Sequence, residues 1–162
     1  MFEQIDKKKH QLDAKRPFPK YTVQSLREKL FLEWTYNSNA IEGNTLTINE
    51  TKVVLEGITV GGKTMREHLE VINHRDAISY VEDIVHKEEL FSEWQIKNLH
   101  RLVLKGIDDS YEGVYRDQQV FISGAVHTPP PPFKIQEEMD ALMDWYNGEA
   151  QILHPIVRGA ML

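Results

Sequence analysis

Apolar residues recur every three or four positions along most of the chain, which is the spacing of one helix face and not of a β-strand. Short polar stretches with glycine, proline or capping residues separate the apolar runs. The pattern predicts a helical protein with one interruption between residues 118 and 132. The predicted helices cover about residues 3–15, from Thr22 or Ser25 to the motif at 38–44, 47–57, 64–87, 92–106, 134–147 and from about 150 onward.

Capping residues mark several helix starts. Thr47 with Glu50, and Ser92 with Gln95, have the spacing of capping boxes, in which each residue bonds the backbone of the other. Thr64 is placed to cap the longest helix. Two apolar helix faces are expected to form much of the core. These faces consist of Leu26, Leu30, Phe31 and Trp34 in the second helix, and of Met65, Leu69, Ile72, Ala77, Val81 and Ile84 or Val85 in the helix at 64–87.

The period changes near residue 118. Residues 118–122 are β-prone, Ser123 and Gly124 favour a turn, and residues 125–128 are suited to a returning strand. Four prolines at 129–132 then forbid further strand pairing and favour an extended segment. Because an isolated hairpin is only marginally stable, it must lie on the helices or be completed by another chain. The predicted fold class is all-α with one β-hairpin at 118–128.

Composition narrows the class of function. The 162 residues suit one compact domain, and no apolar run is long enough to span a membrane. The net charge of −6 argues against non-specific binding to nucleic acid or to an anionic membrane. With no cysteine, the chain has neither disulfides nor thiolate chemistry, which is typical of a cytoplasmic protein.

One short motif places a carboxylate in an unusual position. Ser38 and Glu42 are four residues apart, so they share a helix face, and Gly43 is suited to end that helix. A carboxylate at a helix C-terminus is unfavourable by roughly 0.3–1 kcal/mol, which suggests a cationic partner elsewhere. A second polar position, Asn73, lies in the middle of the longest helix and is expected to bond a neighbouring backbone.

The residues alone show no active site. No H-E-x-x-H, G-x-G-x-x-G, G-x-x-x-x-G-K-S/T or G-x-S-x-G motif occurs, and no metal site is predicted. His68 and His74 are six residues apart and do not share a helix face. Arg116 and Arg158 are candidate anion contacts, although single arginines more often form surface ion pairs.

Several stretches, taken in order over residues 38–158, resemble the Fic family of AMP-transferring enzymes. The resemblance implies an all-α domain at 38–162 with a β-hairpin, preceded by a helical region at 1–37. The matching stretches are Ser38-Asn39-Ala40-Ile41-Glu42-Gly43-Asn44, Val71-Ile72-Asn73-His74-Arg75-Asp76-Ala77, Leu99-His100-Arg101 through Lys105-Gly106-Ile107, Gly113-Val114-Tyr115-Arg116 and the run from Val120 to Pro130.

The resemblance also implies roles for particular residues. Glu42, with Ser38 at the hydroxyl position of the motif, would be inhibitory by pairing with an arginine that otherwise holds the ATP γ-phosphate. The hairpin would be a flap that pairs with an extended segment of a target protein, or of the protein itself, and presents its hydroxyl. ATP and Mg²⁺ are the implied cofactors of the complete protein, and an oligomer is compatible with the pattern. The flap residues are Val120, Phe121, Ile122, Ser123 and Gly124.

One departure from the family is decisive for activity. The catalytic signature H-P-F-x-D/E-G-N-G-R-x-x-R does not occur, and His154-Pro155 does not continue into it. We therefore expect an N-terminal part of a Fic-type enzyme that lacks catalytic residues and is inactive alone. The alternative is a non-enzymatic module that binds an extended peptide through the hairpin.

Overall fold

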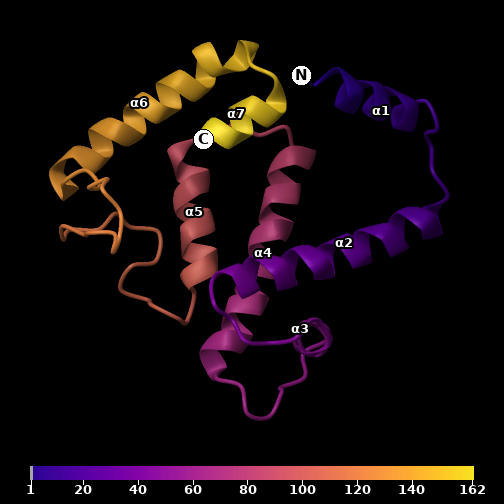
Figure 1. Cartoon of the computed structure of the whole chain (residues 1–162), viewed down its shortest axis with the longest axis horizontal. Helices are drawn as coiled ribbons and strands as arrows, with labels where there is room; N and C mark the ends of the chain where they lie inside the picture. The colour runs from indigo at the N-terminus through magenta and orange to yellow at the C-terminus, as the bar shows by residue number, and fades with distance from the viewer. Residues whose placement is uncertain (1) are drawn as a thin grey trace. The chain divides into compact units, whose positions relative to one another are not determined.

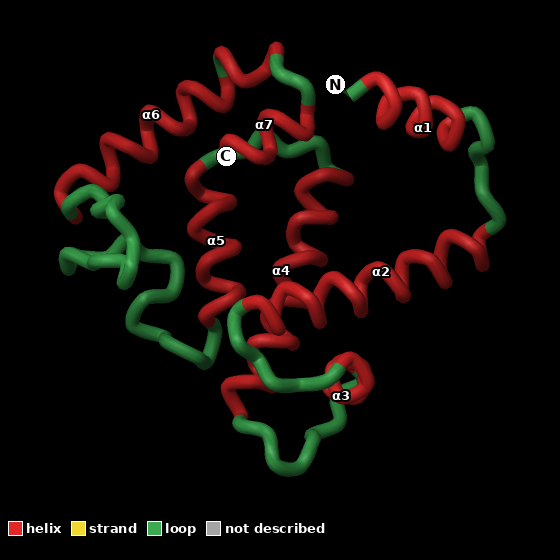
Figure 2. The backbone as a smooth tube through the Cα atoms, in the orientation of Figure 1, coloured by secondary structure: helices red, strands yellow, loops and turns green. Residues whose placement is uncertain are grey.

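The computed structural model describes residues 2–162, and all regular elements within this range are helices (Figures 1 and 2). The all-α class is therefore confirmed. No helix in this range is both long and apolar enough to cross a membrane. The elements are α1 (Glu3–Asp13), α2 (Lys20–Ile41), α3 (Ile48–Leu55), α4 (Met65–His86), α5 (Glu93–Leu104), α6 (Ile135–Asn147), α7 (Pro155–Met161) and two 3₁₀ helices, η1 (Pro132–Lys134) and η2 (Glu149–Ile152).

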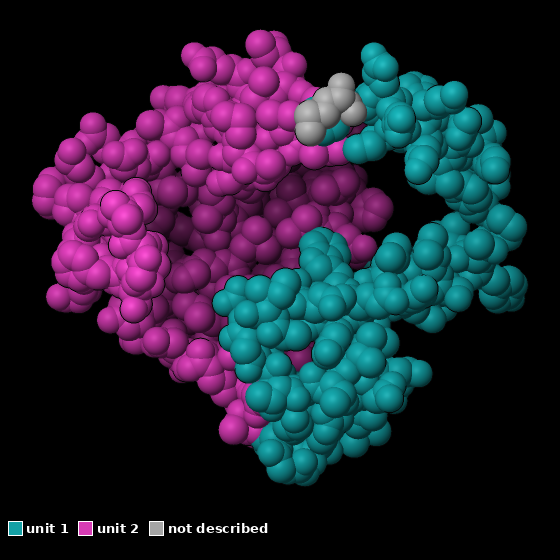
Figure 3. Space-filling model, in the orientation of Figure 1, with its two compact units in different colours: residues 1–63 teal, residues 64–162 magenta. Residues whose placement is uncertain are grey.

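The chain divides into two compact units, residues 1–63 and residues 64–162 (Figure 3). The first holds α1 to α3 and the second holds the remaining helices. These units are groups of residues that contact one another, whereas the predicted boundary after residue 37 separates a family domain from the region before it. The division therefore does not test that boundary. That boundary stays a prediction.

In the first unit, α2 packs on α3. The predicted capping box is present: the Glu50 N–H donates to Thr47 Oγ1 at 3.2 Å, and the Thr47 N–H donates to Glu50 Oε2 at 2.7 Å. Helix α2 begins at Lys20 and not at Thr22 or Ser25. Pro19 precedes it without a side-chain cap, because the proline side chain has no acceptor atom, and its carbonyl accepts the first helical hydrogen bond, from Val23, at 3.1 Å.

The core predicted along α2 is mostly wrong. Leu26, Leu30 and Trp34 are 54, 53 and 56% exposed, whereas Thr35 and Asn39 are buried. The apolar spacing identified the helix correctly, but a periodic stripe does not say which neighbour covers it. Of the first unit's helices, only α3 makes a substantial packing contact with α2.

In the second unit, α4 and α5 lie side by side (Figure 1). Thr64 caps α4 as predicted and forms a capping box with Glu67. The predicted inner face is wrong at Met65 and Val81, which are 70 and 37% exposed. Of the two alternatives at its end, Val85 is 69% exposed, whereas Ile84 is half-buried. Apolar residues are distributed around most of α4, so the sequence period does not define one face. The buried residues of α4 are His68, Val71, Asn73, Ala77 and Ile78.

Buried Asn73 joins α4 to the end of α5, which confirms its expected packing role. Its Nδ2 donates to the carbonyl of Val103 at 3.1 Å and to the carbonyl of Lys105 at 2.8 Å. These acceptors lie at the C-terminus of α5, where helical carbonyls lack intrahelical partners. One side chain on α4 therefore fixes where α5 ends.

Two further local predictions are corrected. Ser92 precedes α5 but forms no capping box, because its hydroxyl bonds the side-chain oxygen of Gln95 and not the backbone. The segment 118–128 is not a β-hairpin, since no strand occurs anywhere in residues 2–162. Its only backbone–backbone hydrogen bond is a turn, in which the Ala125 N–H donates to the Ile122 carbonyl at 3.2 Å. With no third strand and prolines immediately after it, the segment has no sheet to join.

Replacing Asn73 by alanine is expected to lower the free energy of unfolding by about 2 kcal/mol, because two carbonyls at the end of α5 lose their donor. Urea unfolding followed by circular dichroism measures the change. Asn37→Ala is the matched control, since Asn37 is exposed and donates only to the carbonyl of Glu33. Its effect is expected to stay within about 0.5 kcal/mol, and equal losses in the two variants would contradict the role of Asn73.

Candidate functional site

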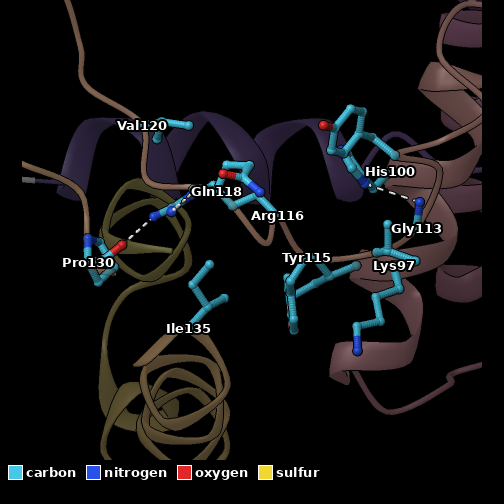
Figure 4. A pocket seen from close by; sticks show the side chains of 12 residues that line it. Lys97, His100, Gly113, Tyr115, Arg116, Gln118, Val120, Pro130 and Ile135 are labelled. Atoms are coloured by element: carbon cyan, nitrogen blue, oxygen red, sulfur yellow. Dashed lines mark hydrogen bonds between the residues drawn. The ribbon is translucent and has the colours of Figure 1, made fainter. Parts of the chain in front are cut away.

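The candidate site is a pocket in the second unit beside the segment at 118–128, which is called the flap segment below. The pocket has a volume of about 660 Å³ and is lined mainly by apolar surface (Figure 4). Volumes of this size are typical of sites that receive a small molecule or a few side chains. Its walls are formed by Ile96, Lys97 and His100 of α5, by Tyr111, Gly113, Val114, Tyr115 and Arg116 of the following loop, by Gln118, Val120 and Pro130 of and beside the flap segment, and by Ile135 of α6.

One wall is held together by the carboxylate of Glu93. Its Oε1 accepts from the Tyr115 hydroxyl at 2.9 Å and pairs with Lys97 Nζ at 2.7 Å, while its Oε2 accepts from Gln136 Nε2 at 3.1 Å. The Lys97 ammonium also lies 4.3 Å from the centroid of the Tyr115 ring. These four residues, called the Glu93 junction below, connect α5, the loop after it and α6.

The junction fixes the protonation of its members. The hydrogen bonds from Lys97, then Gln136, then Tyr115 hold the pKa of Glu93 below its usual value. Burial, then the hydrogen bond to Glu93, then the charges of Glu93 and Asp140 raise the pKa of Tyr115 far above the usual value for a phenol. At neutral pH the carboxylate is ionised and the phenol keeps its proton, so Tyr115 is a structural donor and not a base or nucleophile.

Gly113 presses the loop onto α5. Its backbone has φ +65°, and a Cβ there would lie 2.9 Å from the carbonyl oxygen of Lys97. Its N–H donates to His100 Nδ1 at 3.2 Å (Figure 4). Only glycine satisfies both the positive φ and the close approach, which explains a glycine among the loop residues that line the pocket.

The flap segment leaves backbone groups unused. Within residues 2–162, no backbone–backbone hydrogen bond joins residues 118–122 to residues 126–130, and the N–H groups of Val120, Phe121 and Ile122 donate to no atom of the chain. Gly124 turns the chain at φ +77°. The side chains of Phe121 and Ile122 are 77 and 54% exposed. The segment therefore offers both apolar side chains and free backbone donors to an extended partner.

The predicted inhibitory residues lie in the first unit. Ser38 is half-buried in the last turns of α2, and Glu42 is the exposed residue that ends this helix. Gly43 has φ +93°, and its N–H donates to the carbonyl of Ala40 at 3.1 Å, so the expected helix stop is confirmed. The inhibitory role of Glu42 and Ser38 stays a prediction. Of the predicted flap residues, Val120 lines the pocket, whereas Phe121, Ile122, Ser123 and Gly124 do not.

Arg116 and Arg158, the two candidate anion contacts named from the sequence, both bond other parts of the chain. Arg116 donates to the backbone carbonyls of Gln118 and Pro130. Arg158 lies over the Tyr146 ring and donates to Gln151 at 3.0 Å. Sequence reasoning missed Glu93 and Tyr115 as site residues, because a hydrogen bond between side chains 22 positions apart leaves no periodic signal.

The pocket does not fit a magnesium–nucleotide complex. Lys97 is paired with Glu93, and Arg116 is committed to two carbonyls, so neither cation is available to phosphates without breaking these contacts. Across the part of the chain that the structure describes, no three histidine, aspartate or glutamate residues gather in a way that could hold a metal ion.

The comparisons with known proteins agree on one family. A model of the Fic/DOC family matches residues 90–162. The chain is 34% identical over 164 residues to the protein adenylyltransferase Fic of Nematostella vectensis and 36% identical over 140 residues to the protein adenylyltransferase fic-1 of Caenorhabditis elegans. The matches cover 99 and 84% of this chain but only 38 and 27% of those relatives.

Solved structures agree with the sequence matches. A crystal structure of a Fic domain containing signaling protein from Bacteroides thetaiotaomicron has a TM-score of 0.82 at 30% identity, covering 91% of this chain and 58% of that one. The structure of Fic-1 from C. elegans has a TM-score of 0.79 at 28% identity, covering 92% of this chain and 44% of that one. Similarity of fold and of sequence therefore extends over both compact units.

The Glu93 junction predicts a pH dependence of stability. Because the folded-state pKa of Glu93 lies below its unfolded value of about 4.3, its contribution is complete above that value and is lost as the pH falls through the folded pKa. Between about pH 5 and about pH 3, the Glu93→Gln variant is therefore expected to lose less unfolding free energy than the unaltered chain. Urea unfolding at each pH measures this difference.

Glu137→Gln on the exposed surface of α6 is the control. It is expected to keep the full pH dependence, because it retains Glu93. The other carboxylates with lowered pKa values, Asp13 and Glu50, are retained in both variants and do not distinguish them. Identical pH profiles for Glu93→Gln and the unaltered chain would contradict the assignment.

Proposed function

Because the chain belongs to the Fic/DOC family, we propose that it is the N-terminal part of a protein adenylyltransferase, which transfers AMP from ATP to a hydroxyl side chain of a target protein. The observation that carries this proposal is the similarity to a protein adenylyltransferase along 99% of the chain. The chain spans 38% of the length of that relative, so the activity is proposed for the complete protein.

In the proposed reaction, the acceptor hydroxyl oxygen attacks the α-phosphorus of ATP, the bond from that phosphorus to the β-phosphate oxygen breaks, and pyrophosphate leaves. This requires a base for the hydroxyl proton and donors for the phosphates. The signature H-P-F-x-D/E-G-N-G-R-x-x-R, which supplies these groups in the family, does not occur in these 162 residues. We therefore assign ATP and Mg²⁺ to the complete protein, and no catalytic residue to this chain.

The flap segment is proposed to hold the acceptor. The N–H groups of Val120, Phe121 and Ile122 are free, and in an extended conformation alternate ones, such as those of Val120 and Ile122, are suited to pair with one extended peptide. The neighbouring apolar side chains give that peptide a surface to cover. No strand is needed for this, because an extended partner brings its own backbone acceptors. The acceptor is a hydroxyl of another protein or of the protein itself.

Glu42 is proposed to restrain the activity. A carboxylate at the end of α2 competes with the γ-phosphate of ATP for an arginine of the catalytic signature, and charge-assisted contacts of this kind are strong and directional. Ser38 occupies the hydroxyl position of the same motif, one helical turn earlier. In this proposal, the inhibitory motif at 38–44 belongs to the domain at 38–162, and residues 1–37 are an N-terminal helical region. The proposed location is the cytoplasm.

A second function is favoured by the flap segment, whose two sides are not paired by backbone hydrogen bonds beyond the turn. In that case the chain binds an extended peptide and transfers nothing. The negative charge disfavours a nucleic acid as the partner in either case.

The 162-residue chain is expected to transfer no AMP, because the base and the phosphate donors are not among its residues. Incubation with ATP labelled in the α-phosphate, Mg²⁺ and a mixture of acceptor proteins, followed by gel autoradiography, measures this. The positive control is the same chain followed by a segment with the catalytic signature. Turnover by the 162 residues alone would refute the assignment of catalysis to that segment.

In the longer polypeptide, Glu42→Gly is expected to raise AMP transfer at least about tenfold, since a charge-assisted hydrogen bond worth about 1.5–3 kcal/mol no longer competes with ATP. Glu56→Gly is a matched control, because Glu56 also ends a helix of the first unit, α3. Equal rates and equal ATP affinities for the Glu42→Gly and unaltered polypeptides would show that Glu42 is not inhibitory.

A further inference from the structure

The two arms of the flap segment are joined by side chains and not by a backbone ladder. The first arm is residues 118–122, and the second is residues 125–128 together with the adjoining Pro129 and Pro130. The turn between them has the single backbone hydrogen bond from Ala125 to Ile122. Away from the turn, the contacts between the arms come from two residues. Arg116 donates from Nη1 to the Gln118 carbonyl at 2.8 Å and from Nη2 to the Pro130 carbonyl, and Gln119 Nε2 donates to the Pro129 carbonyl at 3.1 Å.

The geometry of the Arg116 guanidinium is suited to fix the distance between the two carbonyls that it bonds. The guanidinium is a rigid planar fork, so two donors on different nitrogens hold two acceptors at a fixed separation. The carbonyls of Gln118 and Pro130 lie at the bases of the two arms, 12 positions apart in sequence (Figure 4). Within residues 2–162, no backbone N–H donates to the Pro130 carbonyl, so this carbonyl is available to the guanidinium.

Arg116 is itself held in place. It is half-buried and follows Tyr115, whose hydroxyl bonds Glu93, and Gly113 packs against α5 three residues earlier. Within residues 2–162, no carboxylate pairs with its guanidinium, and both of its described hydrogen bonds go to carbonyls of the two arms. The contacts of Gly113 and Tyr115 with α5 therefore hold Arg116, and Arg116 in turn holds the two arms.

We propose that Arg116 is a positioning residue that clasps the two arms of the flap segment and so sets the backbone conformation that receives the acceptor. The clasp uses carbonyls at the base and leaves the N–H groups of Val120, Phe121 and Ile122 available. The part of this inference that concerns the acceptor rests on the proposed function, whereas the clasp itself does not.

The first test uses the 162-residue chain and does not depend on any activity. Chymotrypsin cleavage after the exposed Phe121 reports on opening of the flap segment. In Arg116→Ala, loss of the two hydrogen bonds is expected to raise the cleavage rate about tenfold, without a matching fall in the urea midpoint. Arg66→Ala is the matched control, because Arg66 is an exposed arginine of α4 that pairs with Glu70.

Arg116→Lys separates the fork from the charge. One ammonium cannot hold both carbonyls at the spacing of a guanidinium, so this variant is expected to be cleaved nearly as fast as Arg116→Ala. Full protection in Arg116→Lys would overturn the fork argument, and unchanged cleavage in Arg116→Ala would overturn the clasp altogether.

The second test uses the longer polypeptide with the catalytic signature. Arg116→Ala is expected to raise the KM for the acceptor protein about tenfold, while the KM for ATP stays unchanged, since the flap segment contacts only the acceptor. A purely structural defect would lower kcat and alter both KM values. An unchanged acceptor KM together with faster cleavage would refute the link to the acceptor. If the unaltered polypeptide transferred no AMP, the proposed function would be refuted instead. The cleavage experiment would then still decide whether Arg116 holds the two arms together.

Discussion

The candidate site depends on one carboxylate that three separate segments share. Glu93 receives hydrogen bonds from Lys97 on its own helix, from Tyr115 in the loop and from Gln136 on α6. Charge-assisted hydrogen bonds are shorter and more directional than neutral ones, so this carboxylate fixes geometry more than it contributes stability. Without it, Tyr115 in the loop and Gln136 at the start of α6 lose the acceptor that they share, and the wall of the pocket that they form is no longer held together.

Local chemistry could be predicted from the sequence. Thr47 with Glu50, and Thr64, identify helix starts because capping involves residues no more than three positions apart. The role of Asn73 also followed from a general rule, that a buried amide must find partners, although the sequence could not name the carbonyls of Val103 and Lys105.

Tertiary contacts could not be predicted. Leu26, Leu30 and Trp34 have the spacing of a core stripe and are nevertheless exposed, since periodicity identifies a face but not its neighbour. The flap segment has strand propensity without a sheet to join, and propensity for strands is largely a measure of packing on neighbouring strands. The Glu93 junction joins residues up to 43 positions apart and has no sequence signature at all.

The missing ladder in the flap segment has a physical consequence for binding. In a hairpin, the cross-strand hydrogen bonds use the backbone groups on the inner edges of both strands, and only the outer edges remain for a partner. Here the arms are held by Arg116 and Gln119 at carbonyls near their bases, so the N–H groups of Val120 to Ile122 carry no internal bond. A partner strand on one edge then gains the alternate bonds on that edge but must order the segment as it binds, which reduces its affinity. A clasp that restricts the arms beforehand lowers this entropic cost, and it does so without occupying the donors that the partner needs.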